Sequence, residues 1–449
     1  MTVAVGAAQS GLAAIVGAER VVADESARAA FAVDGRVPGW VVFPQSSAHV
    51  AGVLRFAAEH ELAVIPCRNG TKLRVGNPPR RYDIALSLKD MNRVWHYEPA
   101  DLTISAEPGM KFGDFLHFVG RHGLWLPLDP AGGGRASLGG IVATNSTGPL
   151  RLSYGAPRDM VLGMKIATSD GKIVKTGGRV VKNVAGYDMA KLLIGSYGTL
   201  GVIVEVSFKL FPLPVTRSTF VIPAGTLGIG RDTRRRILGS PLNPMRMVLL
   251  DARAATLMRR GTSVAAEIKE PEIWIEFGGS EKVLDRCARE LEGLGKAAGA
   301  PVQRLEATSA VKVWDRIGDF QNCLSEVSPR VTILKVALPG AAGEEFLSRA
   351  NQEAASEGVR LASFAQVGVG VVHLGLLDEV SETVALVGRL RSAAEDLGGA
   401  LVVERCSPEL KERLDVWGAT GDDFNVMKQV KAAWDPKGVL SPGRFVGGL

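Results

Sequence analysis

The sequence predicts an α+β protein with two domains of unequal size and a C-terminal segment. Its 449 residues exceed one ordinary domain and suffice for two hydrophobic cores. In the first half, short apolar runs that end at Gly or Pro alternate with helical patterns, which is typical of mixed α and β structure. Prolines and a polar run at 212–218 then interrupt the regular structure. We therefore expect domains at 1–215 and 216–408, followed by a segment at 409–449.

The first domain is expected to begin with a strand, a helix and a second strand. The apolar runs at 41–43 and 63–65 each end at a proline, and apolar residues over 50–58 fall on one helical face between them. Further strands are expected at 84–88, 102–106, 161–168 and 173–175, and a further helix over 112–119. Because Ser169-Asp170-Gly171 suits positive φ, the last two strands are expected to form an antiparallel hairpin.

Strands alternate with amphipathic helices in the second domain as well. The strands are expected near 247–250, 272–277, 331–338 and 401–404, and the helices near 281–296, 341–357 and 380–397. The C-terminal segment shows helical spacing from Phe424 to Lys431, followed by two turns that contain Pro and Gly.

The composition is that of a globular protein in water, with 46% hydrophobic and 22% charged residues. The net charge of +6 arises from 53 Lys and Arg against 47 Asp and Glu, a mild excess for a large surface, so we expect no nucleic-acid partner. The densest basic run, Arg234-Arg235-Arg236, is interpreted as a solvated helix face.

The four cysteines do not indicate a metal centre. They lie far apart, without the paired spacing of a zinc site or an iron–sulfur cluster, at Cys67, Cys287, Cys323 and Cys406. Any such cluster must therefore belong to another chain. Isolated thiols also fit a reducing compartment, and we expect a cytoplasmic location.

The first 18 residues contain no charge. A signal peptide would carry Lys or Arg near its start, so we expect these residues to form the first helix of the fold. No other stretch approaches the roughly 20 apolar residues of a spanning helix, and membrane contact is expected only peripherally, through a partner.

Two glycine-rich loops indicate a site for a dinucleotide diphosphate. The first covers residues 66–72 and contains an Asn-Gly turn, whose exposed N–H groups can bind an anion but which can equally be only a turn. The second begins at Gly132-Gly133-Gly134 and continues through Ser137-Leu138-Gly139-Gly140, where adjacent glycines permit close backbone approach. Neither is a Rossmann or Walker motif, which argues against a nicotinamide-only dehydrogenase and an NTPase.

A third glycine cluster, Gly195 to Gly201, precedes a strand. At this point the sequence resembles the FAD-linked oxidases of the vanillyl-alcohol oxidase and p-cresol methylhydroxylase (PCMH) type over nearly the whole chain. The residues that carry the resemblance are Lys182 to Asp188, Gly195 to Gly201, and the ending from Asp435 to Phe445. Within the family, the chain is most similar to the FAD-binding subunits of bacterial glycolate oxidase.

The resemblance implies a PCMH-type FAD-binding domain of two α+β subdomains, a cap with an antiparallel sheet, and a C-terminal segment that returns to the FAD domain. The residues it assigns to FAD are Arg68, Asn69, Gly70, Thr71, Ser137, Leu138, Gly139, Gly140, Thr144, Asn145, Gly201 and Val202. Several relatives attach the flavin through a histidine in the first loop. Here that loop has none, so FAD is expected to bind non-covalently, with Cys67 a weaker candidate for attachment.

The resemblance also implies oxidation of a 2-hydroxy acid such as glycolate or D-lactate. In such enzymes the flavin takes a hydride, a base takes the hydroxyl proton, and an arginine binds the carboxylate. The candidate catalytic residues here are Arg316 and His373. Arg316 is at least as well explained as a salt-bridged residue of the cap, and His373 as a core or capping residue.

A metal is not expected. Similar 2-hydroxy-acid dehydrogenases have a histidine pattern, H-x-G-x-G-x-x-H, and a later Glu-His pair that bind one. The corresponding residues here are Gln366 to His373 and Glu404-Arg405, so two of three histidines are missing and a metal would be underligated.

Two functions remain open from the sequence. The chain is either an FAD-dependent 2-hydroxy-acid dehydrogenase that passes electrons to an iron–sulfur partner, or a non-catalytic flavin electron-transfer or assembly subunit of a multi-subunit glycolate oxidase with a catalytic homologue. A scaffold without flavin is disfavoured because all three glycine clusters are present.

Overall fold

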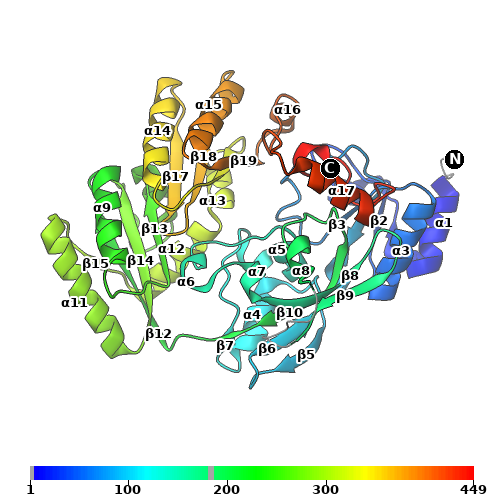
Figure 1. Cartoon of the computed structure of the whole chain (residues 1–449), viewed down its shortest axis with the longest axis horizontal. Coiled ribbons are helices and arrows are strands. Elements are labelled where there is room, and N and C mark those ends of the chain that lie inside the picture. Colours follow the sequence, from blue (N-terminus) through cyan, green and yellow to red (C-terminus); the bar gives the residue numbers. More distant parts are fainter. Residues whose placement is uncertain (1–4, 180–186) are drawn as a thin grey trace.

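The computed structural model describes residues 5–179 and 187–449 and divides into two lobes (Figure 1). The first lobe contains two sheets from the N-terminal half together with the C-terminal segment, and the second lobe is built on one large sheet. Of the residues that carry the family resemblance, Lys182 to Gly186 lie outside the described residues.

The first sheet has the order β1-β2-β4-β3, in which β2, β4 and β3 are parallel and β1 is antiparallel. Its strands are β1 (Val21–Val22), β2 (Trp40–Val42), β3 (Val64–Cys67) and β4 (Ile84–Ser87). Helices α1 (Val5–Val16) and α3 (Ser47–Glu59) pack in the core on one face of it, and α2 (Glu25–Ala29) follows β1. The expected strand–helix–strand unit and the helix near the N-terminus are therefore confirmed.

Helix α3 illustrates why the local sequence was enough to predict this helix. The Ser46 hydroxyl accepts a hydrogen bond from the backbone N–H of His49 and caps the helix. Val50, Val53 and Leu54 then lie on the buried face at helical spacing.

The second sheet is antiparallel, in the order β5-β6-β10-β8-β9. Its strands are β5 (Val94–Glu98), β6 (Thr103–Ala106), β8 (Val161–Ala167), β9 (Ile173–Gly177) and β10 (Val202–Lys209). The predicted hairpin of β8 and β9 is confirmed. Nearby are the short pair β7 (Leu124–Trp125) and β11 (Phe211–Pro212) and the helices α4 (Phe112–Gly120), α5 (Leu138–Ala143), α6 (Arg151–Tyr154), α7 (Pro157–Met160) and α8 (Ala190–Leu193).

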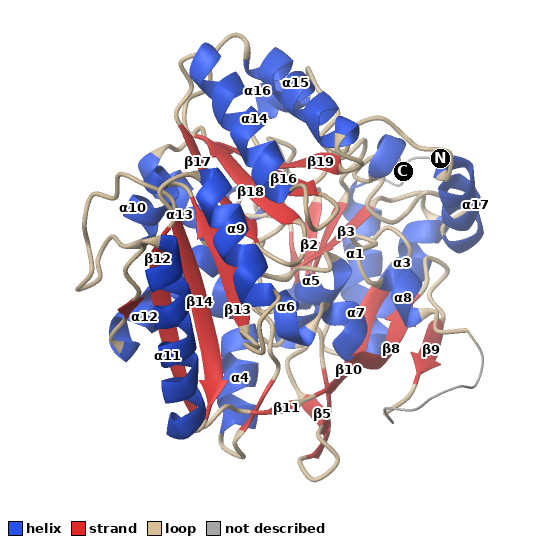
Figure 2. Ribbon diagram, turned by 60° about the vertical axis from the view of Figure 1, so that its left-hand side comes forward, coloured by secondary structure: helices blue, strands red, loops and turns tan. Residues whose placement is uncertain are grey.

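The second lobe is an eight-stranded antiparallel sheet in the order β15-β12-β14-β13-β17-β18-β16-β19. The strands are β12 (Thr216–Pro223), β13 (Arg246–Leu250), β14 (Glu272–Gly279), β15 (Gln303–Arg304), β16 (Thr332–Ala337), β17 (Leu361–Gln366), β18 (Val371–Leu376) and β19 (Ala400–Arg405). Helices α9 (Leu227–Leu238), α11 (Glu281–Ala298), α14 (Gly343–Ser356) and α15 (Thr383–Asp396) pack on one face, and α10 (Ala252–Met258), α12 (Ala307–Gly318) and α13 (Phe320–Val327) on the other (Figure 2).

Two expectations for this region are wrong. The polar run that begins at Thr216 does not end the regular structure but forms β12. This strand pairs with β14 along its length. Its Thr219 hydroxyl also accepts a hydrogen bond from the Trp314 indole. Arg234 is not on a solvated face: it is buried, with its Nε 2.7 Å from an Oε1 atom of Glu344, and only Arg235 and Arg236 are exposed.

The C-terminal segment packs on the first lobe, where α17 (Phe424–Trp434) lies near the N-terminal helices (Figure 1). The short helix α16 (Pro408–Lys411) ends at Lys411, whose ammonium group is fully buried. Lys411 Nζ contacts Asp34 at 2.9 Å and the carbonyls of Arg74 and Gly76.

The 3₁₀ turns are Ala18–Arg20, Leu88–Asp90, Gly133–Arg135 and Val446–Gly448. Among the described helices, none has the length and hydropathy needed to cross a bilayer.

Candidate functional site

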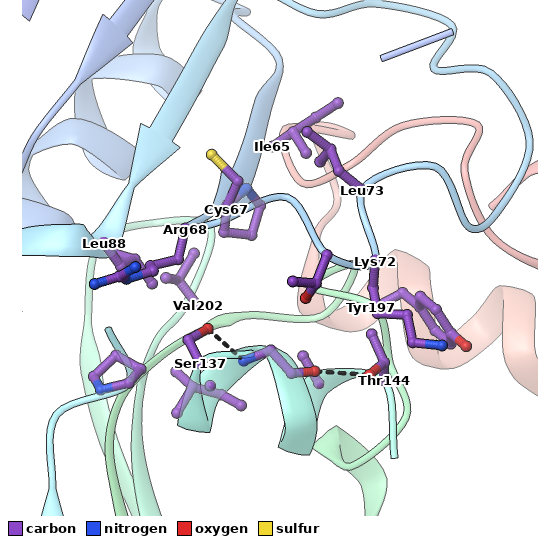
Figure 3. Close-up of a pocket in the computed structure, with 18 of the residues that line it drawn as sticks. Ile65, Cys67, Arg68, Lys72, Leu73, Leu88, Ser137, Thr144, Tyr197 and Val202 are labelled. Atoms are coloured by element: carbon purple, nitrogen blue, oxygen red, sulfur yellow. Dashed lines mark hydrogen bonds between the residues drawn. The ribbon is translucent and has the colours of Figure 1, made fainter. Parts of the chain in front are cut away.

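A groove in the first lobe brings the three glycine clusters together. One wall is the loop after β3, the second is the start of α5, and the third is the segment that leads into β10 (Figure 3). This central groove is lined by residues 65–73, Val75, Leu88, Pro108, Ser137, Gly139, Gly140, Ala143, Thr144, 196–198, 201–203 and Arg444. Segments that are distant in the sequence therefore share one cavity, as the resemblance implied.

The start of α5 approaches its neighbours closely. The Ser137 hydroxyl accepts from the Gly140 N–H at 3.3 Å, and the Thr144 hydroxyl donates to the Gly140 carbonyl at 2.7 Å (Figure 3). The Gly139 N–H donates to the Pro108 carbonyl, and a Cβ at Gly139 would lie 2.6 Å from Pro108 Cβ. Glycine is needed here because any side chain would push α5 away from Pro108.

The loop after β3 is fixed from two sides. Its turn uses Gly70 at φ +69°, and the Arg68 Nε donates to the Gly109 carbonyl at 3.0 Å. On the other side, Arg444 donates to the carbonyls of Leu73 and Val75. The loop therefore keeps its shape through contacts with residues far away in the sequence.

Arg444 also shows that the groove fits an anionic cofactor. Its side chain is 5% exposed and lines the groove, and its Nη1 atom is buried without a hydrogen-bond partner. A buried guanidinium with an unused donor is suited to a phosphate or another anion. Together with the glycine backbone at 139–140, this arrangement is compatible with the diphosphate of FAD.

Ten of the twelve residues expected to bind FAD line this groove; the exceptions are Leu138 and Asn145. Leu138 is fully buried in the core beneath the five-stranded sheet, because the first turn of α5 directs it inward. Asn145 follows α5 at φ +47° with a buried, unpaired Oδ1.

Several lining residues were not predicted from the sequence, including Leu88, Pro108, Tyr197 and Arg444. Tyr197 lies inside the third glycine cluster and has a positive φ of 54°. Its ring packs against Trp417 and Phe445 of the C-terminal segment, at centroid distances of 5.1 and 5.8 Å. The glycine cluster in the sequence pointed to the segment that contains Tyr197, but the packing of its ring could be seen only in the folded structure.

A second cavity adjoins the groove. This inner cavity shares Lys72, Thr144 and Tyr197 with the groove, and Figure 3 shows Lys72 and Tyr197 at the end away from Arg68 and Leu88. Its remaining lining comprises Ala131, residues 146–149, Ile317, Gly318, Phe320, Gln321, Lys335, Phe364, Gln366, His373 and Glu404. The inner cavity therefore lies where the two lobes meet.

Charged groups are concentrated in the inner cavity. Lys72 Nζ lies 3.7 Å from Glu404 Oε2, and the Gln321 amide donates to the same oxygen. Burial opposes ionisation of Glu404, but the charges of Lys72 and Lys335 outweigh it and lower the pKa of this carboxyl to about 2. Burial also lowers the pKa of the Lys335 ammonium, although the negative charge of Glu404 acts in the opposite direction.

His373 is buried in the wall of the inner cavity. Its ring stacks on Phe364 at a centroid distance of 4.8 Å, and its Nε2 lies 3.2 Å from the Gln366 amide nitrogen. Burial lowers the pKa of His373 to about 3, so the imidazole is neutral at neutral pH. The structure thus places this candidate residue in a cavity.

The structure does not place Arg316 there. Helix α12 presents Ile317 and Gly318 to the inner cavity, whereas Arg316 donates to the Leu257 carbonyl at 3.2 Å and lies 3.9 Å from Glu326. A one-residue step along a helix changes the side-chain direction by about 100°, so Ile317 faces the inner cavity while Arg316 does not.

The donor set of the inner cavity does not suit a metal. Gln366 faces His373 in place of a histidine, and Glu404 is already engaged by Lys72 and Gln321. Within residues 5–179 and 187–449, no cluster of three or more His, Cys, Asp or Glu side chains could hold a metal ion.

Comparison with known proteins gives two family matches. A profile described as "FAD binding domain" matches residues 38–177, and one described as "FAD linked oxidases, C-terminal domain" matches residues 214–445. The chain is 26% identical to the glycolate oxidase subunit GlcD of Bacillus subtilis, covering 91% of this chain and 89% of that protein. It is 29% identical to a D-lactate dehydrogenase of Archaeoglobus fulgidus, covering 90% and 91%.

Solved structures share the fold. The structure of p-cresol methylhydroxylase with substrate bound superposes with a TM-score of 0.76 at 16% identity, covering 98% of this chain and 96% of that one. A 4-ethylphenol oxidase from Gulosibacter chungangensis gives a TM-score of 0.77 at the same identity and coverage. The expected α+β architecture with an antiparallel cap sheet is thus confirmed.

Gly139→Val tests the groove. Overpacking against Pro108 costs about 1–3 kcal/mol, so we expect the Kd for FAD to rise by about tenfold, measured by titrating apoprotein with FAD. Gly120→Ala is the control, because its added Cβ meets no atom within 4 Å. Unchanged FAD affinity in Gly139→Val would show that the groove is not the cofactor site.

Proposed function

This chain belongs to the family of FAD-linked oxidases, and on this premise we propose that it oxidises a small 2-hydroxy acid, of the glycolate or D-lactate class, to the 2-oxo acid. The observation that carries the proposal is that the central groove and the inner cavity share Lys72, Thr144 and Tyr197 as lining residues. A flavin held in the groove would have its substrate beside it, in a cavity with two ammonium groups and one carboxylate. The names of relatives that act on glycolate or D-lactate support this substrate class.

The charge of the inner cavity favours a carboxylate substrate. Lys72 and Lys335 contribute two positive charges, Glu404 contributes one negative charge, and His373 is neutral. A monoanion would therefore neutralise the cavity. Since charges interact strongly at low dielectric, this balance selects an anionic substrate over a neutral alcohol of similar size.

Different residues of the chain bind the cofactor and take up the substrate proton. Arg68 to Thr71, Ser137, Gly139, Gly140, Thr144, Gly201, Val202 and Arg444 hold the cofactor, and bound FAD supplies the acceptor for a hydride. We assign His373 as the base for the hydroxyl proton, because its imidazole is neutral and an entering carboxylate raises its pKa. Arg316 has a structural role in this proposal.

We propose that the electrons leave through another protein. The four cysteines are unpaired, and Cys287, Cys323 and Cys406 are buried at separate places, so this chain offers no cluster ligands. We propose an iron–sulfur subunit as the acceptor, with a catalytic homologue as a further partner and peripheral membrane contact through the complex. Unpaired cysteines are also consistent with the cytoplasm.

One observation favours a second function. Gln366 and Arg405 stand where related 2-hydroxy-acid dehydrogenases have histidines, so the machinery of this chain differs from theirs. The alternative is a non-catalytic flavin electron-transfer or assembly subunit of a multi-subunit glycolate oxidase. The domain division at 215 and 408 is part of both proposals.

FAD is expected to be non-covalent. The first loop has no histidine, and burial raises the pKa of the Cys67 thiol to about 12, so the thiolate needed for attachment is scarce. Acid precipitation should therefore release all the flavin into the supernatant, as measured by absorbance. Yellow colour retained in the washed pellet would contradict this expectation.

Anaerobic reduction separates the two functions. When the purified FAD-loaded chain is mixed with glycolate or D-lactate, we expect the visible flavin band to bleach, whereas acetate and propionate, which lack the hydroxyl group, should leave it unchanged. Flavin that stays oxidised alone and is reduced only after partner chains are added would establish the alternative.

A further inference from the structure

Lys335 has an unusual position in the inner cavity. It lies on β16 directly opposite His373 of β18, which in turn lies opposite Phe364 of β17. Side chains of directly opposed residues share one face of a sheet, so these three form a row across neighbouring strands. All three line the inner cavity.

The half-buried Lys335 ammonium lacks the partners that other lysines of low exposure have. Lys411 contacts Asp34 at 2.9 Å, Lys431 contacts Asp435 at 2.6 Å, and Lys72 lies 3.7 Å from Glu404. Among the described residues, Lys335 Nζ forms no hydrogen bond and no ion pair within 4 Å, although Glu404 attracts it from farther away. A half-buried ammonium that lines a cavity and has no protein counter-ion is suited to bind an anionic ligand.

The same groups oppose a divalent cation. A metal between His373 and Glu404 would have one imidazole and one carboxylate, and the carboxylate oxygen is already bound by Lys72 and Gln321. The nearby ammonium groups would also repel it. The lysines therefore provide the positive charge that a metal would otherwise bring to an anionic substrate.

We propose that Lys335 binds the carboxylate of the substrate and that this site works without a divalent metal. The proposal rests on the proposed function for the identity of the substrate, but anion binding itself does not require turnover. A 2-hydroxy acid held by Lys335 would have its hydroxyl end free to approach His373, which lies beside it in the row.

Oxamate is the probe, because it is an inert monoanion of the size of a short 2-oxo acid, and oxamide is its neutral counterpart. Binding to the FAD-loaded protein is followed by the perturbation of the oxidised flavin spectrum. We expect oxamate but not oxamide to bind, with a Kd at least about tenfold higher in Lys335→Met. Lys335→Arg, which keeps the charge, should recover part of the affinity.

The control is Lys312→Met, because Lys312 is an exposed lysine of α12 outside the inner cavity. It should leave the Kd unchanged. FAD content should equal that of the wild type in all variants. Lys335→Met should be at least as heat-stable, since it removes an unpaired, half-buried charge. EDTA, Zn²⁺ and Mn²⁺ should alter neither oxamate binding nor flavin reduction.

A second measurement uses the wild type and does not depend on a variant that folds. Oxamate should protect Lys335 from acetylation by acetic anhydride, read out by mass spectrometry, whereas oxamide should not. Oxamate affinity that is unaffected by Lys335→Met, acetylation without protection, or activity that EDTA removes and a metal restores would each overturn the proposal. Oxamate binding that depends on Lys335 in a chain that no 2-hydroxy acid reduces would support the site and refute the proposed function.

Discussion

The ion pair between Lys72 and Glu404 is the contact on which the arrangement of the site depends. Lys72 comes from the loop that forms one wall of the central groove, and Glu404 comes from β19 in the other lobe. Both side chains are almost completely buried, at 13% and 7% exposure. Buried pairs contribute little net stability but are costly to break, by about 3–5 kcal/mol, so the pair fixes where the groove ends and the inner cavity begins.

The loop that carries Lys72 depends in turn on the C-terminal segment. The buried ammonium of Lys411 and the guanidinium of Arg444 satisfy backbone carbonyls between residues 73 and 76, which have no strand or helix partners. The last 40 or so residues therefore shape a loop near the N-terminus. This dependence explains why a cofactor loop in this fold requires residues from both ends of the chain.

Local patterns predicted most of the fold and the location of the groove. The capped α3, the β8–β9 hairpin and the three glycine clusters depend on short-range chemistry that the sequence displays directly. The inner cavity could not be predicted in this way, because Lys335 and His373 become neighbours only through strand pairing. The direction of the Arg316 side chain could not be predicted for the same reason, because it depends on how α12 packs against its neighbours.

The central claim is that a flavin in the groove faces a substrate held by Lys335. Its most direct test is a crystal structure of the FAD-loaded chain with oxamate. We predict FAD along the three glycine clusters, its flavin ring toward Lys72 and Tyr197, and the oxamate carboxylate within hydrogen-bond distance of Lys335 Nζ. FAD outside the groove, or a carboxylate bound at Arg316 instead, would contradict the account.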